Sequence, residues 1–294
     1  MSAYRERGPI SPASESAPVT AARQVGRTYA AHATTQAMLA GLEQWTPGGA
    51  ALWTRANHAG REVTLLEGPA VVAGLVAGTL LDGGPSRRMR ATCAAGLAAI
   101  GAVGAYDDVA GATATKGLKG HLGALARGEV TTGALKIGVI GVAGLLGAAA
   151  VRADAGRLVL HPGTLLDAAL VAGAANLVNL LDLRPGRALK ASLLGSALPV
   201  ATSSGGALAA PVVGSALAAA PDDLAATAML GDCGSNALGA AIGTSVVAAA
   251  GARVRALTVV GLVALTLASE RVSFSQVIAA TPWLRRLDEW GRVG

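Results

Sequence analysis

Charged and aromatic residues are scarce in this chain of 294 residues. Charged residues make up 14% and aromatic residues 3%, whereas an ordinary soluble domain carries roughly 25% charged residues. So little charge argues against a soluble enzyme, an intrinsically disordered protein and a coiled coil. Cysteine is equally rare. Cys93 and Cys233 stand far apart and match no metal-binding or redox spacing, so we expect no disulfide framework.

Small and apolar residues dominate instead. The chain contains 40 glycines, 52% of its residues are hydrophobic, and its mean hydropathy is +0.50. The glycines follow no three-residue period, which argues against a collagen-like repeat. Glycine and alanine let neighbouring helices approach closely inside a bilayer. The composition therefore predicts an all-α fold, a polytopic membrane helix bundle without a β domain.

Apolar segments alternate with short polar loops from residue 64 onward. Each segment is close to the roughly 20 residues that a helix needs to cross a bilayer. They predict one membrane domain over residues 64–271, embedded in the lipid bilayer. We expect about eight transmembrane helices, near residues 64–82, 90–106, 134–152, 163–181, 187–204, 206–222, 236–252 and 255–271.

The net charge of +6 and the pI near 9.9 bear on topology. Lys and Arg gather in the cytoplasmic loops of membrane proteins, so we expect no nucleic-acid partner. Most basic residues fall on one side if both termini are cytoplasmic, with the cluster at residues 87–90 as the exception. These counts predict a plasma (inner) membrane protein with both termini inside. Asp167, near the outer end of its span, is expected to face water.

The two terminal segments contain no expected span. We expect residues 1–63 to form a cytoplasmic segment that is partly disordered and contains a weak amphipathic surface helix at 28–45. The tail at 272–294 contains a short helix at 281–291, with Trp283 and Trp290 on its apolar face. Such a helix lies in the membrane interface or packs on protein loops.

The first polar motif is Asp107-Asp108, at the end of the second expected span. Adjacent carboxylates repel one another, which favours a bound divalent cation or retention of a proton by one of them. The loop that follows carries Lys116, Lys119 and His121, a basic cluster suited to phosphate. A solvated helix end and an ordinary basic cytoplasmic loop would explain the same residues.

The second motif is Asn176-x-x-Asn179-x-x-Asp182. This spacing places the three side chains along one stripe of a helix. Amides in hydrocarbon need a partner, either a neighbouring helix or a ligand. Arg184 and Arg187 follow directly and could hold a phosphate.

The third motif is the run GDCGSN at residues 231–236, which opens the seventh expected span. Gly231 and Ser235 suit a tight turn at a helix N-terminus, where backbone N–H groups favour phosphate. Asp232 would repel a bare phosphate, so its presence favours a bridging Mg²⁺. Helix capping alone also explains Asp or Ser at this point.

All three motifs fall at cytoplasmic helix ends in the expected topology. The polar segment at residues 54–61 precedes the first span and could line the same site. Several aspartates, two asparagines and several basic residues at one face suggest a Mg²⁺-bound pyrophosphate substrate that meets a membrane-embedded partner.

Together the motifs resemble those of the polyprenyl-phosphate glycosyl-1-phosphate transferases (glycosyltransferase family 4). This membrane family includes the phospho-N-acetylmuramoyl-pentapeptide transferase and the polyprenyl-phosphate GlcNAc-1-phosphate transferases. Its members carry paired aspartates, an Asn-x-x-Asn-x-x-Asp motif and a Gly-Asp-x-Gly-Ser motif in this order. The resemblance covers roughly residues 54–294.

The resemblance implies transfer of a sugar 1-phosphate from a nucleotide-sugar donor, usually a UDP-sugar, to a polyprenyl phosphate acceptor. UMP is released, Mg²⁺ is the cofactor, and the product serves cell-envelope glycan synthesis. By analogy, Asp232 and Asp107 hold the metal, Asp107 or Asp108 is catalytic, and Asn179 and Asp182 help to bind the nucleotide. A homodimer is compatible with the sequence.

The chain also departs from the family pattern. Gly111 stands where many members have Lys, Asp182 is followed by Leu-Arg-Pro rather than Gly, and residues 270–276 lack the histidines of the muramoyl-pentapeptide branch. These differences disfavour the muramoyl-pentapeptide donor and indicate a short, divergent member. A transporter without chemistry, or a degenerate scaffold with the same fold, remain the alternatives.

Overall fold

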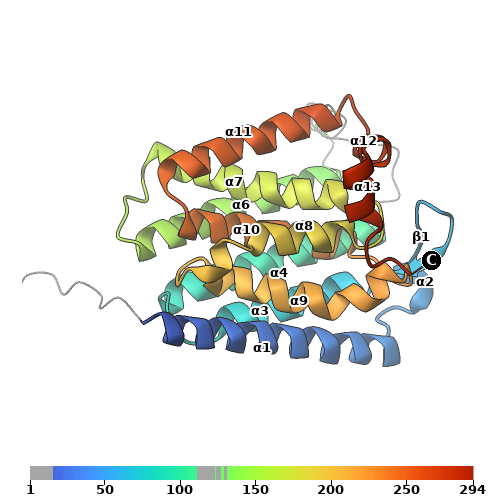
Figure 1. The fold of residues 1–294 in the computed structure, drawn as a ribbon, viewed down its shortest axis with the longest axis horizontal. Helices are drawn as coiled ribbons and strands as arrows, with labels where there is room; N and C mark the ends of the chain where they lie inside the picture. The colour runs from blue at the N-terminus through green and yellow to red at the C-terminus, as the bar shows by residue number, and fades with distance from the viewer. Residues whose placement is uncertain (1–15, 111–122, 124–126, 129–130, 294) are drawn as a thin grey trace, which may run out of the picture.

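The computed structural model describes residues 16–110, 123, 127–128 and 131–293. These residues form a bundle of long helices that run roughly side by side (Figure 1). The elements are α1 (Ala17–Gln44), α2 (Ala50–Trp53), β1 (Thr54–Ala56), β2 (Glu62–Thr64), α3 (Glu67–Leu80), α4 (Arg87–Ala110), α6 (Thr132–Asp154), α7 (Pro162–Leu181), α8 (Arg187–Ser196), the 3₁₀ turn η1 (Pro199–Ala201), α9 (Gly206–Leu224), α10 (Gly231–Ala249), α11 (Ala252–Ser269), α12 (Phe274–Ala280) and α13 (Pro282–Glu289).

Helix α10 lies at the centre of the bundle, in contact with α7, α4, α3, α9 and α6. Most of its residues are buried. A Cβ atom on Gly239 would lie 2.4 Å from the backbone oxygen of Ala174, and one on Gly243 would lie 2.7 Å from the Cα of Val171. Only glycine therefore allows α10 to approach α7 this closely, and the small residues do build the interfaces that the composition predicts.

Among the residues that the structure describes, four helices are long and apolar enough to cross a membrane: α4, α6, α7 and α11. They correspond to four of the eight expected spans and give the chain the character of a membrane protein. The apolar α3 has 14 residues, which is about 21 Å of helix at ~1.5 Å per residue. Two further expected spans, α9 and α10, have 19 residues each but are largely enclosed by the other helices.

The expected span at 187–204 is a different structure. It is divided between α8, which has 10 residues, and the short turn η1 that begins at Pro199. Proline has no N–H to donate and interrupts regular helix hydrogen bonding. An apolar composition was therefore not enough to make this segment one long helix.

The structure before residue 64 differs from the expectation in α1 and in the segment that follows it. The surface helix expected at 28–45 begins earlier, at Ala17, and packs against α3 and α9 with several polar residues buried. Residues 54–64 form an antiparallel hairpin of β1 and β2, with Thr54 opposite Thr64. The expected disorder at residues 8–15 lies outside the described part of the chain.

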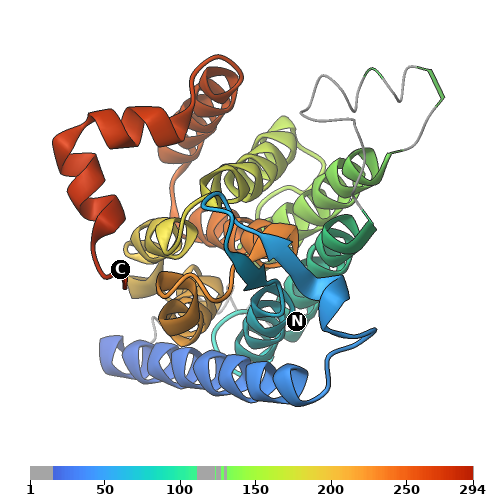
Figure 2. The same ribbon diagram turned by 90° about the vertical axis from the view of Figure 1, so that its right-hand side faces the viewer.

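The hairpin lies across one end of the bundle, which Figure 2 shows face on. Thr64 joins it to the loop before α10, because its backbone bonds to Thr227 and Met229 at 3.0 Å each. This end of the bundle also carries α12 and α13.

Candidate active site

The three polar motifs meet at the bundle end that the hairpin covers. Asp107 and Asp108 lie in the last turn of α4, Asp182 follows the last residue of α7, and Gly231 begins α10. Helices α4 and α7 both pack on α10, so the ends of two helices and the start of a third converge here.

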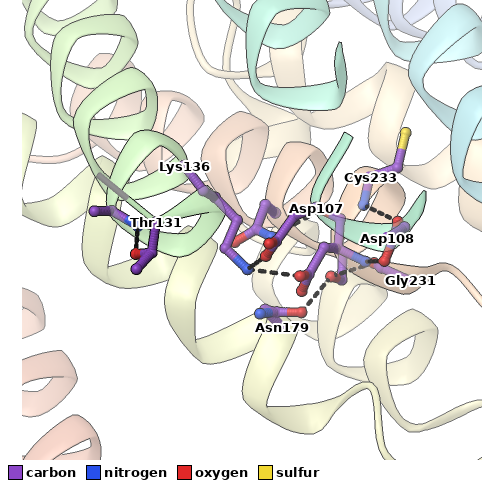
Figure 3. Close-up of polar contacts among 11 residues, drawn as sticks. Asp107, Asp108, Thr131, Lys136, Asn179, Gly231 and Cys233 are labelled. Atoms are coloured by element: carbon purple, nitrogen blue, oxygen red, sulfur yellow. Dashed lines mark hydrogen bonds and ion pairs between the residues drawn. The ribbon is translucent and has the colours of Figure 1, made fainter. Parts of the chain in front are cut away.

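Lys136 joins two of these aspartates. Its Nζ lies 2.6 Å from Asp107 Oδ2 and 2.6 Å from Asp232 Oδ2 (Figure 3). The three side chains are 13–24% exposed, so they form a partly buried group that solvent still reaches. We refer to Asp107, Lys136 and Asp232 as the aspartate–lysine cluster. Two carboxylates around one ammonium leave the cluster with a net negative charge.

Asp108 has a different task from its neighbour. Its Oδ1 and Oδ2 accept hydrogen bonds from the backbone N–H groups of Asp232 and Cys233, both at 2.9 Å (Figure 3). A carboxylate is favourable at the N-terminus of a helix because of the helix dipole. Gly231 has φ of +61°, and a Cβ there would lie 2.7 Å from Asp108 Oδ2. Asp108 therefore holds the end of α4 on the start of α10.

The two asparagines of the second motif point to different partners. The Ser235 hydroxyl lies 2.9 Å from Asn179 Oδ1 and 2.6 Å from the Gly231 carbonyl oxygen. Asn176 instead donates to the Thr266 hydroxyl of α11 at 3.1 Å. Asn179 thus belongs to the site, while Asn176 links two helices.

A cavity of about 260 Å³ lies beside the motifs. Asp182 and Arg184 line one wall, and Asn57 and His58 of the hairpin line another. The segment at 54–61 therefore does border the site, as its position in the sequence suggested. A second cavity of about 210 Å³ shares Asn57 and His58 with the first.

Two groups at this cavity titrate away from their ordinary values. Burial raises the pKa of the Asp182 carboxyl well above its usual value, and the neighbouring Asp223 carboxyl adds to the shift. Burial also lowers the pKa of the His58 imidazole, helped by the positive charge of Arg184. The cavity wall therefore favours a protonated Asp182 and a neutral His58.

All the side-chain hydrogen bonds described for Arg187 are with residues of the C-terminal segment. Its Nε and Nη2 donate to the two carboxylate oxygens of Asp288 in α13 at 2.7 and 2.9 Å, and its Nη1 donates to the Ser275 hydroxyl at 3.0 Å. The phosphate-binding role expected for Arg187 would require this arrangement to open. Arg184 is the arginine of this motif that lines the cavity.

Helix α13 confirms the short helix expected in the tail, although it ends at Glu289. Its charged face meets the bundle through Asp288, and Trp283 and Trp290 are 67% and 73% exposed. The expected binding residues Lys116, Lys119 and His121, together with Gly111, lie outside the described residues.

Lys136 was missed in the sequence analysis, and two other neighbours of the site were included only as members of the segment at 54–61. Lys136 was assigned no functional role, although it is the one Lys in the apolar sequence of α6. Arg55 donates from its Nη2 to the backbone oxygen of Asp108. His58 belongs to the same segment, and no local pattern in the sequence indicates that this segment forms a hairpin beside the cavity.

The aspartate–lysine cluster offers two carboxylates to a Mg²⁺ ion. Within the described residues, no group of three or more His, Cys, Asp and Glu side chains is arranged to hold a metal ion. However, Mg²⁺ is commonly bound by one or two carboxylates together with substrate phosphates and water. Asp107 and Asp232 already converge on one cation, the Lys136 ammonium. The donor set therefore fits a metal that arrives with a phosphorylated substrate.

No family model matches the chain, and no curated protein matches its sequence.

Proposed function

We propose that the chain is a Mg²⁺-dependent enzyme that transfers a sugar 1-phosphate from a UDP-sugar to a polyprenyl phosphate, with release of UMP. The aspartate–lysine cluster is the observation that carries this proposal. It brings together residues from the first and third motifs at one end of a bundle with helices long and apolar enough to cross a membrane.

The proposed reaction is a displacement at phosphorus. A phosphate oxygen of the acceptor attacks the β-phosphorus of the donor, a new P–O–P bridge forms, and the original bridge breaks with UMP as the leaving group. Both substrates are anionic, so positive charge must offset their repulsion. Mg²⁺ held by Asp107 and Asp232 would supply part of that charge.

This chain's own residues supply positioning and further charge. The Lys136 ammonium, held between two carboxylates, would add positive charge beside a phosphate bound at the cluster. Asp108 keeps the first turn of α10 in place through two backbone hydrogen bonds. The cavity lined by Asp182 and Arg184 is the proposed site for the nucleotide.

We assign the acceptor's isoprenoid tail to an apolar groove. The groove lies between α4 and α6, has a volume of about 790 Å³, and reaches Leu135, next to Lys136. An isoprenoid chain in it would leave its phosphate at the aspartate–lysine cluster. The groove is lined by Thr92, Ala95, Gly96, Ala99, Ala134, Leu135, Gly138, Val139, Val142, Ala143 and Leu146.

The proposed enzyme lies in the plasma membrane with this end of the bundle in the cytoplasm, where nucleotide sugars are found. The polymer that receives the sugar belongs to the cell envelope. The motifs lie at one end of the bundle and not at mid-depth, where transporters place their substrate sites. This position favours chemistry over transport.

A donor screen tests the proposal. Purified protein is mixed with polyprenyl phosphate, Mg²⁺ and a panel of nucleotide sugars, and UMP is measured. We expect UMP with one UDP-sugar, a matching lipid-linked sugar phosphate, and loss of both in EDTA. Transport of a lipid-linked sugar without UMP would favour the transporter, and full activity in EDTA would rule out the metal.

A further inference from the structure

Helix α1 turns its polar side chains toward the protein. Gln24, Arg27 and Thr35 are buried along one side of it. Arg27 is 2% exposed, and its guanidinium donates to the backbone oxygens of Leu81 and Gly83 at 3.4 and 2.6 Å. An amphipathic helix on the surface of a soluble protein does the reverse and buries its apolar stripe.

The outward face of α1 is apolar. From Ala17 to Leu42, every residue of which the structure describes, no exposed residue carries a charge. The one exposed amide, Gln36, donates to the Ala218 carbonyl of α9 at 2.8 Å. The exposed residues are Ala17, Pro18, Val19, Ala21, Ala22, Val25, Gly26, Tyr29, Ala33, Gln36, Ala37, Met38, Ala40 and Gly41.

Hydrogen bonds hold α1 along the whole of its neighbour α9. Gln24 donates to the Thr202 carbonyl just before α9, and Thr28 donates to Ala210 within it. With the Gln36 bond, these contacts follow α9 from its beginning almost to its end. In Figure 1, α1 likewise runs the full length of the bundle, and its Gln44 end lies beside the hairpin.

The length of α1 matches a membrane. Its 28 residues extend about 42 Å at ~1.5 Å per residue, more than the ~30 Å of the hydrocarbon core. Trp45, at the hairpin end, is 74% exposed, and Trp is enriched where helices leave the hydrocarbon. The buried polar residues lower the mean hydropathy of α1, so the sequence average does not reveal its apolar outer face.

From this geometry we propose that α1 crosses the bilayer, with lipid acyl chains as the partner of its outward face. Ser16 then lies on the membrane face opposite the aspartate–lysine cluster. Ser16 and the candidate site are therefore on different sides, contrary to the expectation that residues 1–63 lie on the cytoplasmic face with the site. This inference does not rest on the proposed enzymatic function.

Cysteine labelling tests the two sides. Ser16→Cys and Ala59→Cys place one exposed thiol at each end of the bundle, and the native Cys93 and Cys233 are buried. Full-length protein in sealed vesicles of one orientation is treated with a membrane-impermeant maleimide before and after permeabilisation. We expect one variant to be labelled only from outside and the other only after permeabilisation. Labelling of both under the same condition would overturn the proposal.

A spin label on Ala33→Cys tests what covers the helix. Ala33 is exposed midway along α1, and Ala59→Cys is the matched water-exposed control. In vesicles, we expect the Ala33 label to be relaxed at least several-fold more by oxygen, which concentrates in hydrocarbon, than by a water-soluble nickel chelate. The Ala59 label should show the opposite preference.

Two results would overturn the acyl-chain assignment. A chelate preference at Ala33 would mean that α1 lies in water. Protection from both reagents, together with disulfide cross-linking between Ala33→Cys chains, would mean that a second copy covers this face. Neither result depends on whether the protein forms UMP, so failure here is distinguishable from failure of the proposed function.

Discussion

The two ends of the bundle carry ion clusters of opposite composition. At the candidate site, two carboxylates share the Lys136 ammonium. At the other end, Arg152 of α6 and Arg255 of α11 share one carboxylate oxygen of Asp167 in α7, each at 3.0 Å. The first group is partly exposed, whereas the side chains of the second are 0–8% exposed.

This difference in exposure suits the two clusters to different roles. The partly exposed one can bind a ligand, whereas the buried one can only hold helices together. A partly exposed cluster can exchange one ionic partner for another at low cost, because water compensates each group in turn. A buried cluster cannot, since an ion left without its partner is desolvated and unpaired. Asp167 was expected to face water. It is instead completely buried and ties α7 to both α6 and α11.

Asp167→Asn should give the largest effect. Removing the shared carboxylate leaves two buried guanidinium groups without a counter-charge, a change that costs about 3–5 kcal/mol in buried ion pairs. We expect a loss of this size in the free energy of unfolding in detergent, with turnover per folded molecule retained. Asp154→Asn, an exposed carboxylate at the same end, is the control. Equal stability of the two variants would show that the buried cluster does not hold the helices together.

Asp232→Asn should affect rate and not stability. Loss of one preorganised electrostatic contact in an active site typically lowers kcat by about 10²–10³. The thermal midpoint should change little, because Asp232 is partly exposed. Asp222→Asn, near the same end but outside the cluster, should keep full activity. UMP release by each variant is the measurement, and unimpaired release by Asp232→Asn would exclude the cluster from the chemistry.

Lys136→Met tests whether Mg²⁺ and the ammonium compete for the same carboxylates. Without the ammonium, Mg²⁺ should bind more tightly and stabilise the variant more than the wild type. A ligand at 100 times its Kd stabilises by about 2.7 kcal/mol, and we expect a shift of this order at that Mg²⁺ concentration. Thermal unfolding with and without Mg²⁺ measures it, with Lys190→Met as the control. Identical Mg²⁺ responses in all three proteins would argue against a metal at the cluster.

The pH dependence of stability reports on Asp182. Its pKa is raised in the folded protein, so folding favours the protonated carboxyl. That stabilisation is complete below the ordinary pKa of 3.8 and is lost as the pH rises through the folded value. The thermal midpoint of the wild type should therefore fall with rising pH more than that of Asp182→Asn. Parallel profiles would show that Asp182 carries no such linkage.

Asn176→Ala should have the smallest effect. It removes one hydrogen bond between α7 and α11, and such bonds between membrane helices contribute about 0.6 kcal/mol on average. Activity should persist. Asn179→Ala, one turn away, should instead weaken donor binding, which a rise in KM for the donor would show. If both variants behaved alike, the division of this motif between packing and site would be wrong.

Features of the site that depend on neighbouring residues in the sequence could be predicted, and features that depend on contacts between distant helices could not. Helix ends and motif spacing are local, so the sequence could place Asp107, Asp182 and Asp232 together. The role of Lys136 needs the packing of α6 beside α4 and α10, which no spacing along the chain records. Asp107 and Asp108 are adjacent in sequence, but successive residues of a helix point about 100° apart, and only the fold decides which one caps α10 and which one faces Lys136.

The fold shows the same limit. Composition predicted a helical bundle with small-residue interfaces, because helix packing in lipid depends on residue size. It predicted only part of α1, as a weak surface helix at 28–45, because the buried Arg27 and Gln24 lower the mean hydropathy of this segment. Nor could it predict the hairpin at 54–64, which depends on pairing with the loop before α10.

The close approach of α7 and α10 has a consequence for how such a site could change over time. Because the backbones touch at Gly239 and Gly243, the positions of Asn179 and Ser235 are fixed by main-chain packing, and larger residues there would force the helices apart. The rim around the cavity has no such constraint, since Asn57 and His58 belong to a short hairpin. Under the proposed function, a new donor preference should therefore arise by substitutions in the hairpin, while the residues at Asn179 and Ser235 stay as they are.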